Sequence, residues 1–305
     1  MELVEAIILS VLAASTPLLI AATGELVTER SGVLNLGVEG MMIMGAACGF
    51  GAAWWSGSII IGAICGMIAG TLMSLIFALM TLGLAVNQVA TGLALTILGV
   101  GLSGLIGAGF VGERITPAPH LRIPGLTDIP VLGRVVFGED AFVYLSIALI
   151  VGVGWFLYRT RAGLILRACG DNHVSSHALG YPVLRIRTFA VMFGGGCAGL
   201  AGAYLPLAYT PFFIPGMTAG RGWIALALVV FASWRPGRLV IGAYLFGAVT
   251  ILQLHAQALG LGVPSQFMSS LPYLATVIVL VLISRARSGG STAPATLGTV
   301  FVPDR

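Results

Sequence analysis

Long apolar stretches dominate this sequence, and short polar breaks containing glycine or proline divide them. A hydrocarbon core about 30 Å thick requires about 20 apolar residues in a helix, and most of these stretches approach that length. The pattern therefore predicts an all-α polytopic membrane protein with about eight or nine transmembrane or half-spanning helices. The predicted segments are 3–23, 36–54, 59–80, 89–110, 141–158, 187–209, 221–233, 238–257 and 271–284.

Segment 221–233 is too short to cross a membrane at a normal tilt. Such a helix is tolerated where its free backbone groups face protein or a water-filled cavity. We therefore expect a half-spanning or re-entrant helix here, which the sequence ASWRPGR at 232–238 separates from the next span.

Composition supports the membrane class. The chain has 305 residues, of which 58% are hydrophobic and only 9% are charged, whereas soluble domains contain about a quarter charged residues. The basic residues are all arginine and form no basic face, which argues against nucleic-acid binding. The four cysteines contain no C-x-x-C pair, so neither a disulfide framework nor a zinc site is indicated.

The distribution of arginine predicts the orientation. The loop 159–187 contains five arginines and one acid, and more arginines follow the last predicted span. By the positive-inside rule both regions are cytoplasmic, which puts the N-terminus and the loop 111–140 outside and the C-terminus inside. The tail 288–305 is rich in Ser, Gly, Thr and Pro, and we expect it to be a disordered cytoplasmic segment.

This topology contains an inverted repeat within a single transmembrane domain, residues 1–287. The halves are about 1–110 and 187–285, and span 141–158 links them. In transporters with such repeats, the substrate path lies at the interface between the halves. The glycine-framed stretch 32–40 and GRGW at 220–223 occupy corresponding places, because each opens the second element of its half.

Glu39 is the only charged residue between Arg30 and Glu113. An ionisable group inside a membrane is costly and is by default a candidate functional site. A structural role is equally open: burial demands a partner, so Glu39 would brace a broken helix by bonding to backbone N–H groups, to Arg30 or to Arg221. Asn35 lies four residues before Glu39, and this spacing predicts that both share one helical face.

Three more polar residues are candidates for the same region. Asn87 and Gln88 lie at the mouth of the fourth segment, and Arg221 opens the seventh. Asn and Gln inside membranes also join helices by hydrogen bonds, so for Asn87 and Gln88 that structural role competes with ligand contact.

The stretch RACGDNHVSSHALGYPVLRIR, 167–187, is a polar insert between two spans. Its pattern predicts a helix of about two turns outside the membrane, with Asp171 as N-cap and Gly180 as the stop. His173 and His177 have a spacing that suits a metal ion, but no third ligand is near, so a docking surface is the favoured interpretation.

Four stretches together resemble a known family. They are ERSGVLNLGVEGMMIMGA (29–46), GDNHVSSHALGYPVLRIR (170–187), GGGCAGLAGAYL (194–205) and GRGWIALALVVFASWRPGRLVIGAYLFGA (220–248). They resemble the ABC-importer inner-membrane permeases of the branched-chain amino acid and simple-sugar superfamily. The motif NLGVEGMM is most similar to the nucleoside-type permeases that work with basic-membrane-lipoprotein-like receptors.

The resemblance implies a transport subunit and no cofactor. The chain would form half of a nucleoside pathway in the bacterial cytoplasmic membrane and work by alternating access, with simple sugars as the alternative substrates. Its implied partners are an ATP-binding subunit, a second and non-identical permease chain, an extracytoplasmic substrate-binding protein and membrane lipid. The chain has no lysine and hence no GxxxxGK[ST] motif, so ATP hydrolysis would belong to a separate subunit.

The resemblance also assigns residues. It makes 170–180 the coupling helix that meets the ATPase, through Gly170, Asp171, Asn172, Ser175, Ser176 and Gly180. Many relatives have alanine at the two serine positions. The positions around the substrate pathway are Asn35, Glu39, Asn87, Gln88 and Arg221.

Two other classes of protein are compatible with parts of this pattern. An ion-coupled secondary transporter would use Glu39 as a proton or cation site, but the polar insert and the absence of any second intramembrane acid argue against it. An intramembrane enzyme would need a nucleophile–base or metal constellation, which His255 alone does not supply.

Overall fold

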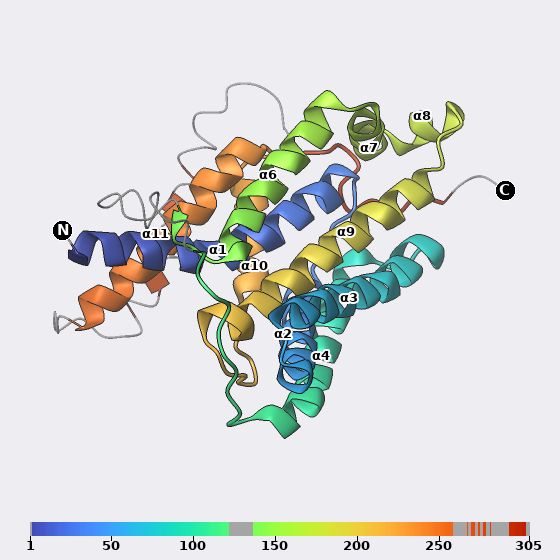
Figure 1. Ribbon diagram of the computed structural model, residues 1–305. Coiled ribbons are helices and arrows are strands. Elements are labelled where there is room, and N and C mark those ends of the chain that lie inside the picture. The colour runs from blue at the N-terminus through green and yellow to red at the C-terminus, as the bar shows by residue number, and fades with distance from the viewer. Residues whose placement is uncertain are drawn as a thin grey trace.

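The computed structural model describes residues 2–121, 137–258 and 293–302, and seven single positions between 267 and 281. Its regular elements within these residues are helical (Figure 1), as the hydrophobic pattern predicts. The α-helices are α1 (Glu2–Arg30), α2 (Val38–Ser56), α3 (Ile59–Ala78), α4 (Gln88–Gly107), α6 (Ala141–Arg159), α7 (Arg161–Asp171), α8 (His173–Ala178), α9 (Val183–Tyr204), α10 (Arg221–Phe231) and α11 (Pro236–Ala258).

Among the described residues, 6 helices are long and apolar enough to cross a membrane: α1, α3, α4, α6, α9 and α11. A π-helical turn lengthens α3 and another lengthens α9. Helix α10 has only 11 residues, in agreement with the expected half-span. The predicted segment 271–284 lies largely outside the described residues, so a total of eight or nine stays a prediction.

Helix α9 lies at the centre of the molecule and packs against α1, α2 and α3 (Figure 1). Glycines allow the backbones to touch: a Cβ added to Gly45 would lie 2.1 Å from the Gly199 oxygen, and one added to Gly199 would lie 2.2 Å from the Gly66 oxygen. Membrane helices associate by this kind of close approach. In contrast, α3 and α4 leave large apolar side chains such as Ile60 and Ile97 exposed.

Helix α1 continues to Arg30, seven residues beyond the predicted end of the first span. It therefore contains two buried acids, Glu25 and Glu29. Glu29 Oε2 accepts a hydrogen bond from Trp234 Nε1 at 2.5 Å, and Glu25 Oε1 accepts one from the Asn35 N–H at 3.3 Å. The inference that the spans hold no second acid is thus wrong, because apolarity alone does not mark the end of a helix whose carboxyl groups find buried partners.

The insert between α6 and α9 contains two helices. Residues 161–171 form the amphipathic α7, whose N-cap is Thr160. The predicted N-cap of α8, Asp171, is wrong: it is the last residue of α7, and Asn172 Oδ1 accepts from the Ser175 N–H at 2.9 Å. Asn172 caps α8 because its backbone is extended there, as N-caps require. Gly180 has a φ of +87° directly after the helix, as a stop signal should.

Part of the C-terminal tail is packed against the protein, although its composition predicts disorder. The Thr296 N–H donates to the Gly170 oxygen at 3.0 Å, and the Gly298 N–H donates to the Gly32 oxygen at 3.2 Å. Phe301 is buried, with its ring centroid 4.8 Å from that of His173. The expectation of disorder is therefore wrong for residues 293–302, because a few anchoring contacts suffice to order a polar segment that composition treats only as an average.

Candidate functional site

Glu39 lies in the first turn of α2 and binds the N-terminus of α10. Its Oε1 accepts from Thr218 Oγ1 at 2.6 Å and from the Gly220 N–H at 2.9 Å, and its Oε2 accepts from the Gly222 N–H at 2.7 Å. The first N–H groups of a helix lack partners within the helix and carry its positive dipole end. The carboxylate therefore accepts hydrogen bonds from backbone N–H groups at the start of α10, although it belongs to a different helix. This supports the interpretation of Glu39 as a brace.

The approach of α2 to α10 depends on glycine. A Cβ on Gly222 would lie 2.5 Å from the Glu39 Cα, which no side chain tolerates. Gly220, the N-cap of α10, has a φ of +81°, a left-handed conformation that favours glycine. The stretches 32–40 and 220–223, which occupy corresponding places in the sequence, are thus in direct contact.

Neither arginine proposed as a partner of Glu39 binds it. Arg221 Nη1 donates to the Met217 oxygen at 2.9 Å, and its guanidinium lies 5.8 Å from the centroid of the Tyr209 ring. Arg30 donates through Nε and Nη2 to the Trp234 oxygen, at 3.2 and 2.8 Å. The donors to Glu39 are therefore two backbone N–H groups, as one of the alternatives expected, and a threonine hydroxyl.

Asn35 does not share a helical face with Glu39, because α2 begins only at Val38. It lies in the non-helical break 31–37, where its Oδ1 accepts from the Gly37 N–H at 3.0 Å. The side chain is fully buried. The prediction of a shared face is wrong because Asn35 builds the turn that precedes the helix, a common role of asparagine.

Gln88 and Asn87 start α4 in different ways. Gln88 is buried; its Oε1 accepts from the Leu34 N–H at 2.8 Å, and its Nε2 donates to the Thr299 oxygen at 3.4 Å. Asn87 is exposed and caps α4, because its Oδ1 accepts from the Ala90 N–H at 3.0 Å. Gln88 thus holds the break 31–37 and the tail together, which supports the interpretation that it joins segments.

A second polar centre surrounds Arg187, whose side chain is fully buried. Its Nε donates to the Ser31 oxygen at 3.0 Å, and its Nη2 donates to Thr296 Oγ1 at 3.0 Å and to the Cys169 oxygen at 3.4 Å. Nη2 also lies 3.2 Å from His173 Nδ1. Arg187 therefore joins the end of α1, α7, α8 and the tail.

Sequence reasoning counted Arg187 only as a marker of the cytoplasmic side. The signal available was its position as the first residue of a predicted apolar span. Burial and then the neighbouring Arg187 lower the pKa of His173 from its usual value, which favours the neutral imidazole at this junction. Among the described residues, no three His, Cys, Asp or Glu side chains gather closely enough to hold a metal ion.

The six predicted coupling residues divide by exposure. Gly170 and Ser176 are buried: a Cβ on Gly170 would lie 2.2 Å from the Arg30 oxygen, and Ser176 Oγ donates to the Asn172 oxygen at 2.9 Å. The exposed members are Asp171, Asn172, Ser175 and Gly180. Two apolar side chains that the motif did not mark, Val174 and Leu179, are 64% and 77% exposed beside them. The accessible surface of α8 is thus partly apolar, which suits protein docking.

Comparison with known proteins agrees with this architecture. Residues 7–286 match the family described as the permease component of the branched-chain amino acid transport system. The chain is 43% identical over 289 residues to a putative glucose ABC transporter permease of Haloferax volcanii, covering 88% of each chain. It is 31% identical over 300 residues to a guanosine ABC transporter permease of Bacillus subtilis, covering 93% of this chain and 94% of that one.

A nucleoside ABC transporter permease of Lactococcus lactis is 30% identical over 319 residues, which cover 98% of this chain and 97% of that one. The family match, residues 7–286, includes all four sequence motifs. The resemblance inferred from the four motifs is therefore confirmed. The chain belongs to the branched-chain amino acid and simple-sugar superfamily of ABC transporter permeases, close to the nucleoside type.

Proposed function

We propose that this chain is the transmembrane permease subunit of an ATP-driven importer and forms half of its translocation pathway by alternating access. The observation that carries the proposal is a continuous line of contacts between the two polar centres. It runs from α8 through Arg187 to Ser31, and the break 31–37 then leads into α2 and Glu39. This line connects a docking surface to the interface between the halves, where inverted-repeat transporters hold their substrate.

In the proposed cycle, a substrate-binding protein delivers the solute to the outward-open pathway. Closure of the ATP-binding subunits pushes on α8, and the two halves rock about the pathway. Arg187 transmits the displacement to the end of α1. Glu39 makes α2 and the N-terminus of α10 move together, because its three hydrogen bonds join them.

The five pathway positions take different parts in this proposal. Asn35, Glu39 and Gln88 use their polar groups on the protein and shape the wall of the pathway. Asn87 is exposed and Arg221 is half-buried, so these two side chains are the candidates for contact with the solute.

We infer a neutral, hydroxyl-bearing solute, because the described helices near α10 offer few free charges to an ionic one. The relatives support two classes of this kind: nucleosides, by the guanosine and nucleoside permeases, and simple sugars, by the more identical putative glucose permease. Nucleosides were the class expected from NLGVEGMM, and the 43% identity makes sugars an equal candidate.

The proposed partners follow from exposed surfaces. Helix α4 packs on α2 and leaves Leu93, Ile97 and Leu105 exposed, a surface that a second and non-identical permease chain would cover. In the proposed topology, α7, α8 and residues 293–302 lie on the cytoplasmic side of the bacterial cytoplasmic membrane, where arginine is concentrated. The N-terminus and the substrate-binding protein lie on the opposite side.

The test is to purify the tagged chain from its native membrane in mild detergent, identify co-purifying proteins by mass spectrometry, and assay ATP hydrolysis. We expect an ATP-binding subunit and a second permease, with hydrolysis stimulated by substrate-loaded binding protein. Leu179→Glu should abolish recovery of the ATP-binding subunit. Val111→Glu, at an exposed site outside α8, is the matched control and should not.

Radiolabelled uptake with nucleosides and sugars as mutual competitors separates the two substrate classes. A chain recovered without any ATP-binding subunit, with uptake driven by an ion gradient, would overturn the importer. The buried acids Glu25 and Glu29, together with Glu39, would then be the residues to test as ion-coupling sites.

A further inference from the structure

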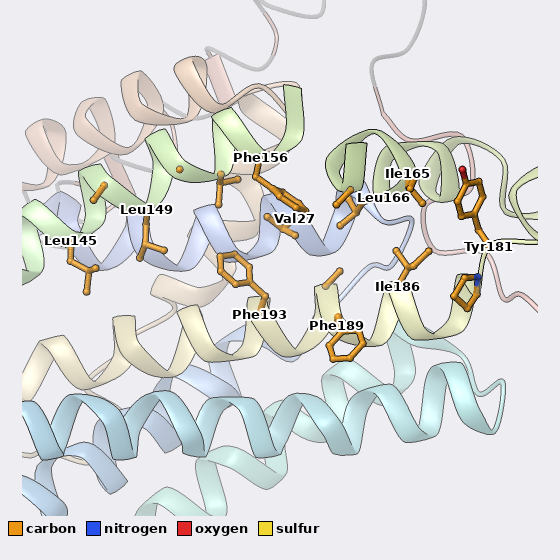
Figure 2. Close-up of a pocket in the computed structure, with 16 residues that line it drawn as sticks. Val27, Leu145, Leu149, Phe156, Ile165, Leu166, Tyr181, Ile186, Phe189 and Phe193 are labelled. Carbon is orange, nitrogen blue, oxygen red and sulfur yellow. The ribbon is translucent and has the colours of Figure 1, made fainter. Parts of the chain in front are cut away.

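An apolar groove of about 830 Å³ runs between α6 and α9. Leu149 and Phe156 of α6, Phe189 and Phe193 of α9, and Val27 of α1 line it (Figure 2). The amphipathic helix α7 borders one end through Ile165. None of the described residues that line the groove is charged, so its interior suits hydrocarbon.

Three arginines continue the faces that line this groove. Arg159 follows Phe156 by three residues on α6, Arg185 precedes Phe189 by four on α9, and Arg161 precedes Ile165 by four on α7. Residues three or four apart share a helical face. Three helices therefore each place one arginine at the end of the groove that α7 borders.

These arginines differ from the others at this end of the molecule. Arg30 and Arg187 donate to backbone oxygens, and Arg167 lies 4.9 Å from the centroid of the Tyr158 ring. Arg159, Arg161 and Arg185 are exposed, and no described residue forms a hydrogen bond or ion pair with them. Three positive charges without a partner among the described residues thus lie beside an apolar groove.

We propose that this groove binds an anionic phospholipid, with an acyl chain between α6 and α9 and the phosphate beside Arg159, Arg161 and Arg185. A ligand that is apolar along its length and negative at one end complements both features at once. Basic pockets between membrane helices on the cytoplasmic side bind the headgroups of anionic lipids in this way. The proposal shares with the proposed function only the cytoplasmic placement of α7.

The experiment is native mass spectrometry of the purified full chain in mild detergent, titrated with phosphatidylglycerol or with phosphatidylcholine of identical acyl chains. We expect one phosphatidylglycerol to be retained preferentially. In the triple variant Arg159→Gln, Arg161→Gln, Arg185→Gln, the affinity should fall about 100-fold, from about 1 kcal/mol for each arginine. Arg235→Gln with Arg238→Gln removes exposed arginines elsewhere and should leave binding unchanged.

A second variant tests the groove itself. A Cβ on Gly152, which lines the groove, would meet no atom within 4 Å, so Gly152→Phe fills the groove without a backbone clash. It should reduce phosphatidylglycerol binding, whereas Gly101→Phe, at an equally open site on α4, should not. Inorganic phosphate should not compete, because it has no acyl chain.

Four results would overturn the proposal: equal retention of the two lipids, unchanged affinity in the triple variant, full competition by inorganic phosphate, or no effect of Gly152→Phe. If Gly152→Phe instead weakened association with a second chain and left lipid binding intact, the groove would be a protein interface. None of these results depends on ATP hydrolysis or uptake, so a failed lipid site and a failed importer are distinguishable.

Discussion

Glu39 and Arg187 are buried groups of opposite charge, and each binds helix ends that carry the opposite partial charge. The Glu39 carboxylate accepts hydrogen bonds at the N-terminus of α10, and the Arg187 guanidinium donates to carbonyls at the C-terminal ends of α1 and α7. Neither forms an ion pair with another described residue. Helix ends thus replace counter-ions in both places, since their partial charges and free backbone groups serve the same purpose.

The two centres differ in how completely they are satisfied. Glu39 joins two elements through three bonds of 2.6–2.9 Å, and both of its oxygens are used. Arg187 joins four segments through bonds of 3.0–3.4 Å, and its Nη1 has no hydrogen-bond partner among the described residues. Glu39 therefore has the geometry of a rigid clamp, whereas Arg187 keeps one nitrogen that could take a new acceptor if α8 moved as proposed.

Replacing Glu39 by alanine should have the largest effect. It leaves the Thr218 hydroxyl and two backbone N–H groups without acceptors, at a cost of about 3 kcal/mol or more, since each unsatisfied buried group costs about 1–3 kcal/mol. We expect uptake to fall strongly while the ATP-binding subunit still co-purifies, because α8 is unchanged. Transport assays in proteoliposomes and thermal unfolding measure both.

Glu39→Gln is the control for charge, because its amide oxygen still accepts hydrogen bonds. It should fall between wild type and Glu39→Ala. If well-inserted Glu39→Ala protein took up solute at the wild-type rate, Glu39 would not be needed for transport, and the proposed role of this clamp would be wrong.

Arg187→Met should have the second-largest effect. It removes the hydrogen bonds that hold four segments together, but these bonds are longer than those of Glu39. We expect a loss of about 2–4 kcal/mol, since each buried oxygen left without a donor costs about 1–3 kcal/mol, and faster proteolysis of residues 293–302. ATP hydrolysis should become less dependent on substrate. Arg238→Met, on the exposed surface of α11, is the control. If hydrolysis stayed fully coupled in Arg187→Met, the junction would be structural only.

Asn172→Ala tests the docking side of the same junction. Loss of an N-cap costs about 1 kcal/mol, and the six-residue α8 has little else to order its first turn. We expect hydrolysis to be partly uncoupled from uptake, and Gly180→Ala to act in the same direction because its φ is +87°. Asp171→Ala, which removes no cap, should change coupling less; an equal change would assign docking to charge and not to helix order.

The smallest expected effect is a pH-dependent change in stability caused by Glu139. Unlike Glu39, this buried acid has one carboxylate oxygen without a described hydrogen-bond donor. It lies outside the spans, its Oε1 has no described partner, and burial followed by Asp140 raises its pKa to about 7. In the unfolded chain this carboxyl group loses its proton at a lower pH than in the folded protein. Its contribution to the free energy of unfolding is therefore at its maximum below about pH 4.5 and falls as the pH rises toward 7.

After allowance for solvent screening, we expect a loss on the order of 1 kcal/mol between pH 5 and pH 8. Glu139→Gln should reduce this dependence when unfolding is followed at both values. An unchanged pH profile in Glu139→Gln would show that ionisation of Glu139 does not affect stability, and the contrast with Glu39 would fail.

The sequence by itself determined the class, most helices and the family. Apolar runs near 20 residues identify spans because the bilayer sets their length, and the shortness of 221–233 predicted that α10 is a short helix. The four motifs identified the superfamily because the spacing of glycines and of the polar residues between apolar runs is a local feature of the sequence. Asn87 as the start of α4 and Gly180 as a helix stop were predictable for the same reason.

Only the tertiary structure decided what the polar groups bind. The partners of Glu39 lie about 180 residues away along the chain, and no local pattern pairs an acid with a distant helix N-terminus. The buried partners of Glu25, Glu29 and Arg187 were not predictable either, because apolarity describes each residue's own side chain and not its neighbours. The order of residues 293–302 likewise depends on contacts with Gly170, Gly32 and Arg187, which exist only once α1, α7 and α9 have come together.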